Sequence, residues 1–176
     1  MGNRSKTNNT PIDGYLAVNA SLSYAEIELS ISKFYGTRQH IIVPNCYINF
    51  GTIADHECDL IVIKRSGYAV EIEIKMSKSD LKADFKKKHG HIDDRLQHLF
   101  YALPSDLYEK CKELIPEYAG IMVVYPHETG AYTRILKSAP VKPCRKLTVD
   151  EQLKIARLGV MRVWNLKKKL ITGSAN

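Results

Sequence analysis

Two runs of strand-forming residues on either side of Arg65-Ser66-Gly67 constrain the fold more than any other part of this sequence. Residues 59–64 and 68–75 are rich in β-branched and other apolar side chains, which favour strands. A three-residue loop that contains glycine is typical of a tight connection between antiparallel strands. The sequence therefore predicts a β-hairpin at this point.

The length of the loop also sets which residues face each other across the hairpin. With three residues in the loop, Lys64 faces Tyr68, and counting back along both strands places Asp59 opposite Glu73. Directly opposed residues share one face of a sheet, with their Cβ atoms about 4.5–5.5 Å apart. Two carboxylates are therefore expected to lie side by side.

The second strand of this hairpin carries charged residues on one face. Side chains alternate along a strand, so Glu71, Glu73 and Lys75 point to the same side. Neighbouring carboxylates repel each other unless a cation or a proton lies between them, and oxygen ligands suit Mg²⁺, or Mn²⁺ in its place. Lys75 could orient or deprotonate an attacking water, or stabilise negative charge on a phosphate. The same spacing is also compatible with a solvated hairpin face that has no chemical role.

The remaining patterns predict a mixed sheet flanked by helices. The expected helices are 21–35, begun by Ser21 or Ser23, then 77–89, 105–114 and 149–170. The expected strands are 39–50, interrupted at Pro44-Asn45, then 59–64, 68–75, 99–103, 120–125 and 131–136. This order indicates an α/β fold with a mixed central sheet. Trp164, the only tryptophan, is expected in the core.

The composition is that of an ordinary folded domain, with 44% hydrophobic and 26% charged residues in a chain of 176. Residues 1–20 are expected to form a flexible arm and residues 21–176 a single domain. No apolar run approaches the roughly 20 residues of a membrane-spanning helix, and the N-terminal segment lacks the apolar core of a signal peptide. We therefore expect a cytoplasmic protein without a membrane partner. The four cysteines are widely spaced and are expected to be reduced, mostly buried thiols.

The charge of the chain is strongly positive and locally concentrated. The formal net charge is +7, and a second basic run occupies 167–169. Basic side chains that neutralise phosphates release condensed counterions, so this excess favours a polyanionic partner, namely DNA. The lysines expected to contact the DNA backbone follow the hairpin closely: Lys78, Lys82, Lys86, Lys87 and Lys88.

The chemistry-bearing segments resemble a known family. Asp59, followed by Glu73-Ile74-Lys75 and preceded by a helix with Glu26 and Glu28, looks like the PD-(D/E)xK nuclease superfamily. The resemblance is closest to its MmcB-like DNA repair branch, through EIEIKMSKSDLKADFKKKHGH, DDRLQHLFYALP and AGIMVVYP. It covers roughly residues 22–165 and implies a restriction-endonuclease-like fold with Mg²⁺ as cofactor.

The resemblance also implies roles for individual residues. Asp59 and Glu73 would hold the metal together with the backbone carbonyl of Ile74, and Lys75 would be the catalytic lysine. A helix glutamate is implied as well. We choose Glu28, because it lies closer than Glu26 to the apolar residues that must face the sheet.

Several further residues have two interpretations. Arg95 could reach the DNA or form a salt bridge with the aspartates before it, and His56 could approach Asp59 or be structural. Ser77, Lys78 and Asp80 could contact a phosphate at a helix start or serve only as helix caps.

The sequence thus predicts a Mg²⁺-dependent nuclease that hydrolyses phosphodiester bonds in DNA. Two other functions are compatible with it: a non-catalytic DNA-binding module of the same fold, and an interaction protein whose basic surface meets an acidic partner. A homodimer is compatible with each of them.

Overall fold

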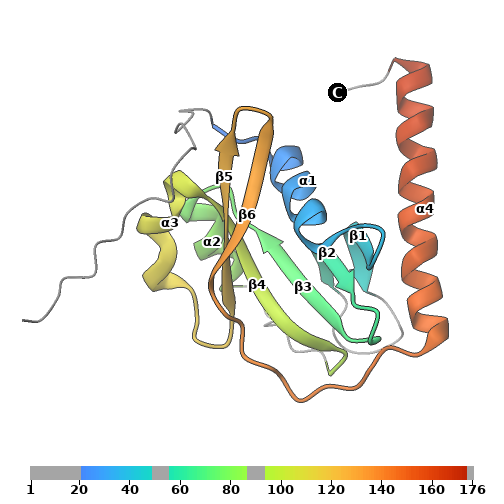
Figure 1. The fold of residues 1–176 in the computed structure, drawn as a ribbon, viewed down its shortest axis with the longest axis horizontal. Coiled ribbons are helices and arrows are strands. Elements are labelled where there is room, and N and C mark those ends of the chain that lie inside the picture. The colour runs from blue at the N-terminus through green and yellow to red at the C-terminus, as the bar shows by residue number, and fades with distance from the viewer. Residues whose placement is uncertain (1–20, 49–55, 87–93, 174–176) are drawn as a thin grey trace, which may run out of the picture.

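The computed structural model describes residues 21–48, 56–86 and 94–173, and it has a mixed α/β architecture (Figure 1). Its strands are β1 (Ile41–Ile48), β2 (His56–Ile63), β3 (Ala69–Ile74), β4 (Leu96–Pro104), β5 (Gly120–His127) and β6 (Gly130–Lys137). Its helices are α1 (Tyr24–Tyr35), α2 (Lys78–Asp84), α3 (Ser105–Cys111), the short 3-10 turn η1 (Lys112–Leu114) and α4 (Val149–Thr172). The order of helices and strands agrees with the sequence prediction. The expected N-terminal arm, 1–20, lies outside the described residues.

The six strands form one open sheet in which every strand lies next to its neighbour in sequence. Strands β3, β4 and β5 are parallel because α2 and α3 carry the chain back between them, whereas the outer pairs are antiparallel. The predicted hairpin register is confirmed, with pairs from Leu60–Ile72 to Ile63–Ala69. The Lys64 amide donates to the carbonyl of Tyr68 at 2.9 Å, which closes the predicted loop.

Strand β1 is interrupted at Asn45, as the sequence predicted. Pairing with β2 is regular on both sides of this residue, at Pro44–Leu60 and Cys46–Cys58. Asn45 itself adopts a left-handed conformation with φ of 48°, which asparagine tolerates better than most residues. The interruption falls opposite Asp59, so the ladder is broken beside a candidate site residue.

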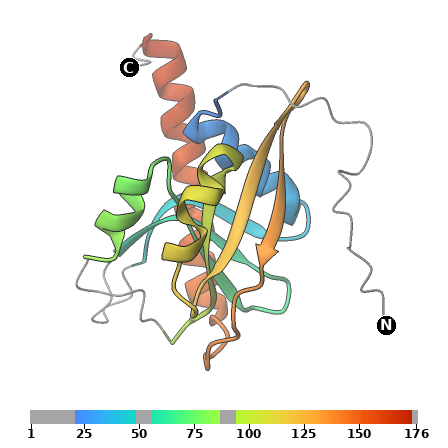
Figure 2. The same ribbon diagram turned by 90° about the vertical axis from the view of Figure 1, so that its left-hand side faces the viewer.

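Helices cover both faces of the sheet. Helix α1 packs through Ile27 and Ile31 on the face formed by Leu60, Val62 and their neighbours. The opposite face, which carries Ile61 and Ile63, packs against α4 at one end and against α2 and α3 at the other. Figure 2 shows α1 and α2 on the two sides of the sheet. The core is therefore divided into clusters above and below the strands.

Helix α2 is shorter than the sequence prediction of 77–89. It ends at Asp84, and the Lys86 amide then donates to the Ala83 carbonyl at 3.2 Å. Such a bond spans three residues instead of four and tightens the chain into a final turn. Lysines are good helix formers, so their run gave no local signal for this ending. Residues 87–93 lie outside the described part of the chain.

Helix α4 corrects the expectation that Trp164 belongs to the core. The N-terminal half of the helix packs on β1 through residues such as Ile155, but Trp164 is 63% exposed. The helix continues past the sheet, so apolar residues in its C-terminal half have no strand to cover. No helix among the described residues has both the length and the apolar character needed to cross a membrane.

The described residues contain no disulfide, and all four cysteines are free thiols. Three of them, Cys46, Cys58 and Cys111, are buried, while Cys144 is partly exposed. The expectation of reduced, mostly buried thiols is therefore met by the structure.

Candidate active site

The C-terminal end of β3 holds three charged residues inside the protein. Glu71, Glu73 and Lys75 are 0%, 1% and 3% exposed. They alternate with the apolar residues that face α1, so all three point toward the side of the sheet that α2 and α4 cover. Burial of this kind is costly unless the charges are paired, and a solvated hairpin face is therefore excluded.

Lys75 is the centre of a buried hydrogen-bond network. Its ammonium Nζ donates to Glu73 Oε2 at 2.7 Å and to Asp84 Oδ1 at 3.0 Å. The other oxygen of Asp84 accepts a bond of 2.9 Å from the hydroxyl of Tyr101. One network thus joins the end of β3 to α2 and to β4.

The surroundings of Lys75 keep its side chain charged. Burial acts to lower the pKa of Lys75, but the charges of Glu73 and Asp84 and their hydrogen bonds outweigh it and raise the pKa above its ordinary value. A protonated amine cannot remove a proton from water. Of the roles that the sequence left open, the geometry favours charge stabilisation.

Glu73 retains one oxygen without a partner. Among the described residues no group donates a hydrogen bond to its buried Oε1, although Oε2 accepts from Lys75. Burial raises the pKa of Glu73 to about 7, and the charges of Asp59 and Glu71 act in the same direction while Lys75 opposes them. A cation beside Oε1 would give this oxygen a partner and would favour the ionised form of Glu73.

Asp59 lies next to Glu73 at the edge of the site. Its Oδ2 accepts a hydrogen bond of 2.7 Å from the backbone amide of Ile74. It also interacts with Tyr24 of α1, whose pKa is raised first by burial and then by the charge and hydrogen bond of Asp59. The predicted neighbours Asp59 and Glu73 are therefore brought together, and α1 joins them.

The two glutamates of α1 have different environments. Glu26 is exposed and completes a capping box with Ser23, in which its carboxylate accepts from the Ser23 amide at 2.7 Å. Glu28 is half-buried, and its pKa is raised by burial and by the charge of Asp59. The helix cap is thus Ser23, not Ser21, and Glu28 is the glutamate that the structure places near Asp59.

The donor set of the site fits a magnesium ion in its chemistry. Asp59, Glu73 and Glu28 offer carboxylate oxygens, and the buried Oε1 atoms of Glu73 and Glu28 have no hydrogen-bond partner in the described chain. No three Asp, Glu, His or Cys side chains in this part of the chain converge as a ready-made metal cage. Mg²⁺ does not require one, because it usually keeps several waters and takes one or two carboxylates together with substrate phosphates.

The predicted DNA-contacting residues fall into three groups. Lys78, Lys82 and Lys86 are exposed on or next to α2, whereas Arg95 is 3% exposed and has little surface to offer a ligand. Lys87 and Lys88 lie outside the described residues, as does the side chain of His56. Ser77 and Asp80 cap α2, because Ser77 Oγ accepts from the Asp80 amide at 3.1 Å.

Sequence reasoning missed Asp84, Tyr101 and Tyr24. Asp84 follows the buried Leu81 by three residues, so helical spacing could have placed it on the inner face of α2. Tyr101 faces Glu73 in the parallel pairing of β3 with β4, and no local pattern reveals that register. Tyr24 begins α1, one turn before Glu28, and its approach to Asp59 depends on helix packing.

Comparisons with known proteins bear on the fold alone. No protein-family model and no curated protein matches this chain. A solved structure of a protein of unknown function from Silicibacter pomeroyi is similar, with a TM-score of 0.59 and 17% sequence identity over 92% of this chain and 97% of that one. The two proteins therefore share an overall fold across nearly their whole lengths.

Proposed function

We propose that this protein is a Mg²⁺-dependent deoxyribonuclease with a restriction-endonuclease-like fold, acting on DNA in the cytoplasm. The observation that carries the proposal is the burial of Lys75 beside Glu73. Asp59 lies next to Glu73, and Glu73 Oε1 has no hydrogen-bond partner among the described residues. A surface that merely bound DNA would gain nothing from burying these charges, because burial costs free energy.

Asp59 and Glu73 would hold the ion, and Mn²⁺ would substitute for Mg²⁺. When bound, such an ion lowers the pKa of a water ligand and polarises a phosphate. Asp59 is oriented for this task by the Ile74 amide, which fixes one of its oxygens. Glu73 offers the oxygen that Lys75 does not occupy.

Lys75 and Glu28 would have two different roles in the hydrolysis, charge stabilisation and proton acceptance. Lys75 keeps its proton and places a positive charge where negative charge develops on the scissile phosphate. Glu28 has a raised pKa and is the group best suited to accept a proton from the attacking water. The contact of Lys75 with Glu73 and the influence of Asp59 on Glu28 support these roles.

A non-catalytic DNA-binding module is the second candidate, and one observation favours it. Lys75 is held by two carboxylates, Glu73 and Asp84, so part of the charge needed for catalysis is already neutralised. The two functions differ in whether any DNA is cut.

The deciding experiment incubates the protein with single-stranded, duplex, branched and abasic DNA in the presence of Mg²⁺ or Mn²⁺. We expect metal-dependent cleavage of at least one substrate and its loss with EDTA. Lys75→Met should lower its rate by about 100-fold or more, whereas the matched variant Lys110→Met, which removes an exposed lysine of α3, should retain it. Salt-sensitive binding without cleavage of any substrate would favour the module.

A further inference from the structure

Helix α4 has an unbalanced charge beyond its first turn. From residue 152 to residue 173 the chain contains no acidic residue. The same stretch holds six basic ones: Lys154, Arg157, Arg162, Lys167, Lys168 and Lys169. The side chains of the projecting part, 160–173, are exposed. Four of the basic residues lie in this projecting part, namely Arg162, Lys167, Lys168 and Lys169, which makes it positively charged.

The contacts of α4 show where this part lies relative to the site. A Cβ added at Gly159 would meet Val43 of β1 at 3.1 Å, so the two elements are in close contact there. One turn later, Arg162 Nη2 donates to the carbonyl of Asn45 at 2.6 Å. Asn45 lies opposite Asp59 in the β1–β2 register. The helix therefore draws level with the site at Arg162 and continues past it for about 16 Å, at 1.5 Å per residue.

Helices α2 and α4 cover the same face of the sheet. Ile155 of α4 packs with Ile61 and Ile63, which face the side that carries Glu71 and Glu73. Leu81 of α2 packs with Tyr101 on that side, beyond the site. The end of β3 is thus flanked by two helices that carry exposed lysines, α4 over β1 and α2 near β4.

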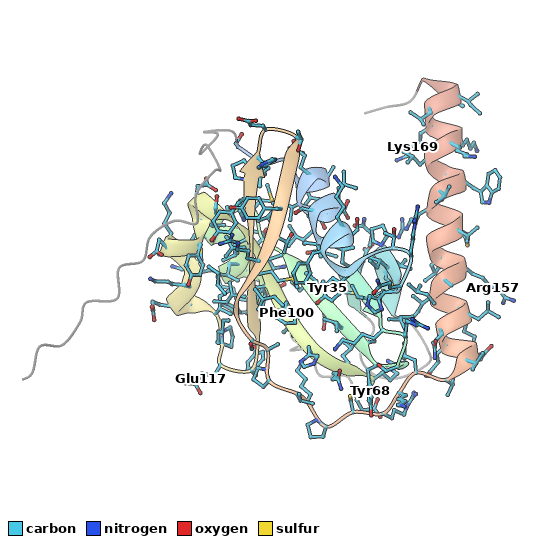
Figure 3. The ribbon with its side chains drawn as sticks, in the orientation of Figure 1. Tyr35, Tyr68, Phe100, Glu117, Arg157 and Lys169 are labelled. Carbon is cyan, nitrogen blue, oxygen red and sulfur yellow. The ribbon has the colours of Figure 1, made fainter. Side chains whose placement is uncertain are left out.

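Basic side chains of α4 differ in direction. Residues seven apart lie on the same side of a helix, so Lys169 continues the side on which Arg162 contacts β1. Figure 3 shows Lys169 directed toward the rest of the protein and Arg157 directed away from it. Lys167 belongs to the outward side, where its Nζ lies 5.1 Å from the ring centroid of Trp164.

We propose that the projecting half of α4 is a second DNA-binding surface, which contacts the phosphate backbone on the side of the site opposite to α2. Lys169 is its principal contact. The inference rests on the proposed action on DNA and adds an element that the hairpin and α2 do not supply. A backbone held at both flanks would be fixed across Glu73 and Lys75.

Charge complementarity selects this occupant. A second copy of the projecting half would bring the same four positive charges against it, and like charges at close range repel. A polyanionic backbone instead gains free energy through counterion release from each lysine it contacts. The apolar residues Val160, Trp164 and Ile171 lie on the outward side and take no part in this contact, whereas the exposed Leu166 lies on the inward side beside Lys169.

The test compares two single variants of the full-length protein that remove the same charge two residues apart. DNA affinity is measured by fluorescence anisotropy over a range of salt concentrations in EDTA, which prevents cleavage. Lys169→Gln should weaken binding roughly fivefold and lower the slope of log affinity against log salt by about one unit, whereas Lys167→Gln should leave the slope unchanged. Lys169→Arg should restore binding, and both glutamine variants should melt like the wild type because each side chain is exposed.

Equal effects of the two glutamine variants would overturn the assignment of Lys169 while leaving DNA binding intact. An absence of salt-dependent DNA binding by the wild type would overturn this inference together with the proposed function. Normal binding by all variants, combined with metal-dependent cleavage, would contradict the role of α4 and leave the proposed function standing.

Discussion

Lys75 Nζ lies 3.0 Å from Asp84 Oδ1, and both side chains are buried. Lys75 directly follows β3, whereas Asp84 is the last residue of α2. The contact fixes α2 against the end of β3. It also gives the lysine a second carboxylate, so its charge is balanced even when Glu73 turns to another cation. Asp84 is therefore a positioning residue for the candidate site.

Removal of Asp84 should destabilise the protein. Asp84→Ala removes one of the two carboxylates that pair with buried Lys75, and it also removes the Asp84 oxygen that accepts from the Tyr101 hydroxyl. Breaking a buried pair in this way typically costs about 3 kcal/mol in the free energy of unfolding, which urea denaturation measures. Asp106→Ala is the matched control, because Asp106 is exposed on α3. A decrease smaller than about 0.5 kcal/mol in Asp84→Ala would contradict the network.

Glu73 should make stability depend on pH. Its pKa rises from the ordinary 4.5 to about 7 in the folded protein, so the folded state holds the proton more tightly than the unfolded state. The free energy of unfolding should therefore fall as pH rises from about 4.5 to 7. Glu73→Gln removes the titrating carboxyl group, so the difference in the free energy of unfolding between the wild type and the variant should change across that pH window. Parallel stability curves would show that Glu73 has an unshifted pKa.

Glu151 should have the opposite dependence. Its pKa is lowered to about 2, chiefly by hydrogen bonds from Arg145, whose two terminal nitrogens lie 2.7 and 2.6 Å from the carboxylate oxygens. Because the folded pKa lies below 4.5, this stabilisation is present above that pH and is lost as pH falls toward 2. Acid titration of the wild type against Glu151→Gln measures it by circular dichroism. The two curves should separate at neutral pH and converge in acid.

The hairpin could be predicted from the sequence because its determinants are local. The loop 65–67 and the alternation of Glu71, Ile72 and Glu73 set both register and facing, and the structure has that register. Glu28 was likewise separable from Glu26 by its angle to the apolar side of α1.

The features that could not be predicted from the sequence depend on tertiary contacts. Trp164 belongs to a helix whose pattern gave no sign of where the sheet beneath it ends. Arg95 precedes a strand in a segment rich in charge, yet it is buried. Tyr101 reaches Asp84 only because parallel pairing brings β4 beside β3, and that pairing joins segments distant in sequence.

A divalent ion should stabilise the folded protein through Asp59. Mg²⁺ or Mn²⁺ at a hundred times its dissociation constant should add about 2.7 kcal/mol to the free energy of unfolding, which appears as a higher melting temperature. Asp59→Asn keeps an oxygen for the Ile74 amide but removes the charge, so it should lose the response without losing the hydrogen bond. Glu26→Gln, in the helix cap, should respond like the wild type. An undiminished response in Asp59→Asn would locate the ion elsewhere.

Catalysis and binding should depend on different residues, namely Lys75 for catalysis and the lysines on or next to α2 for binding. Lys75→Met should lower the cleavage rate at saturating DNA by about 100-fold or more, because the missing charge acts on the transition state. DNA affinity should change little, since Lys75 is only 3% exposed. Replacement of Lys78, Lys82 and Lys86 by glutamine should instead weaken binding to all sequences and reduce the salt slope by about one unit for each phosphate-binding lysine that is replaced. The saturated cleavage rate should survive in that variant. Single-turnover cleavage and anisotropy titrations measure the two quantities separately, and a triple variant that binds normally but fails to cut would reverse the roles assigned to these lysines.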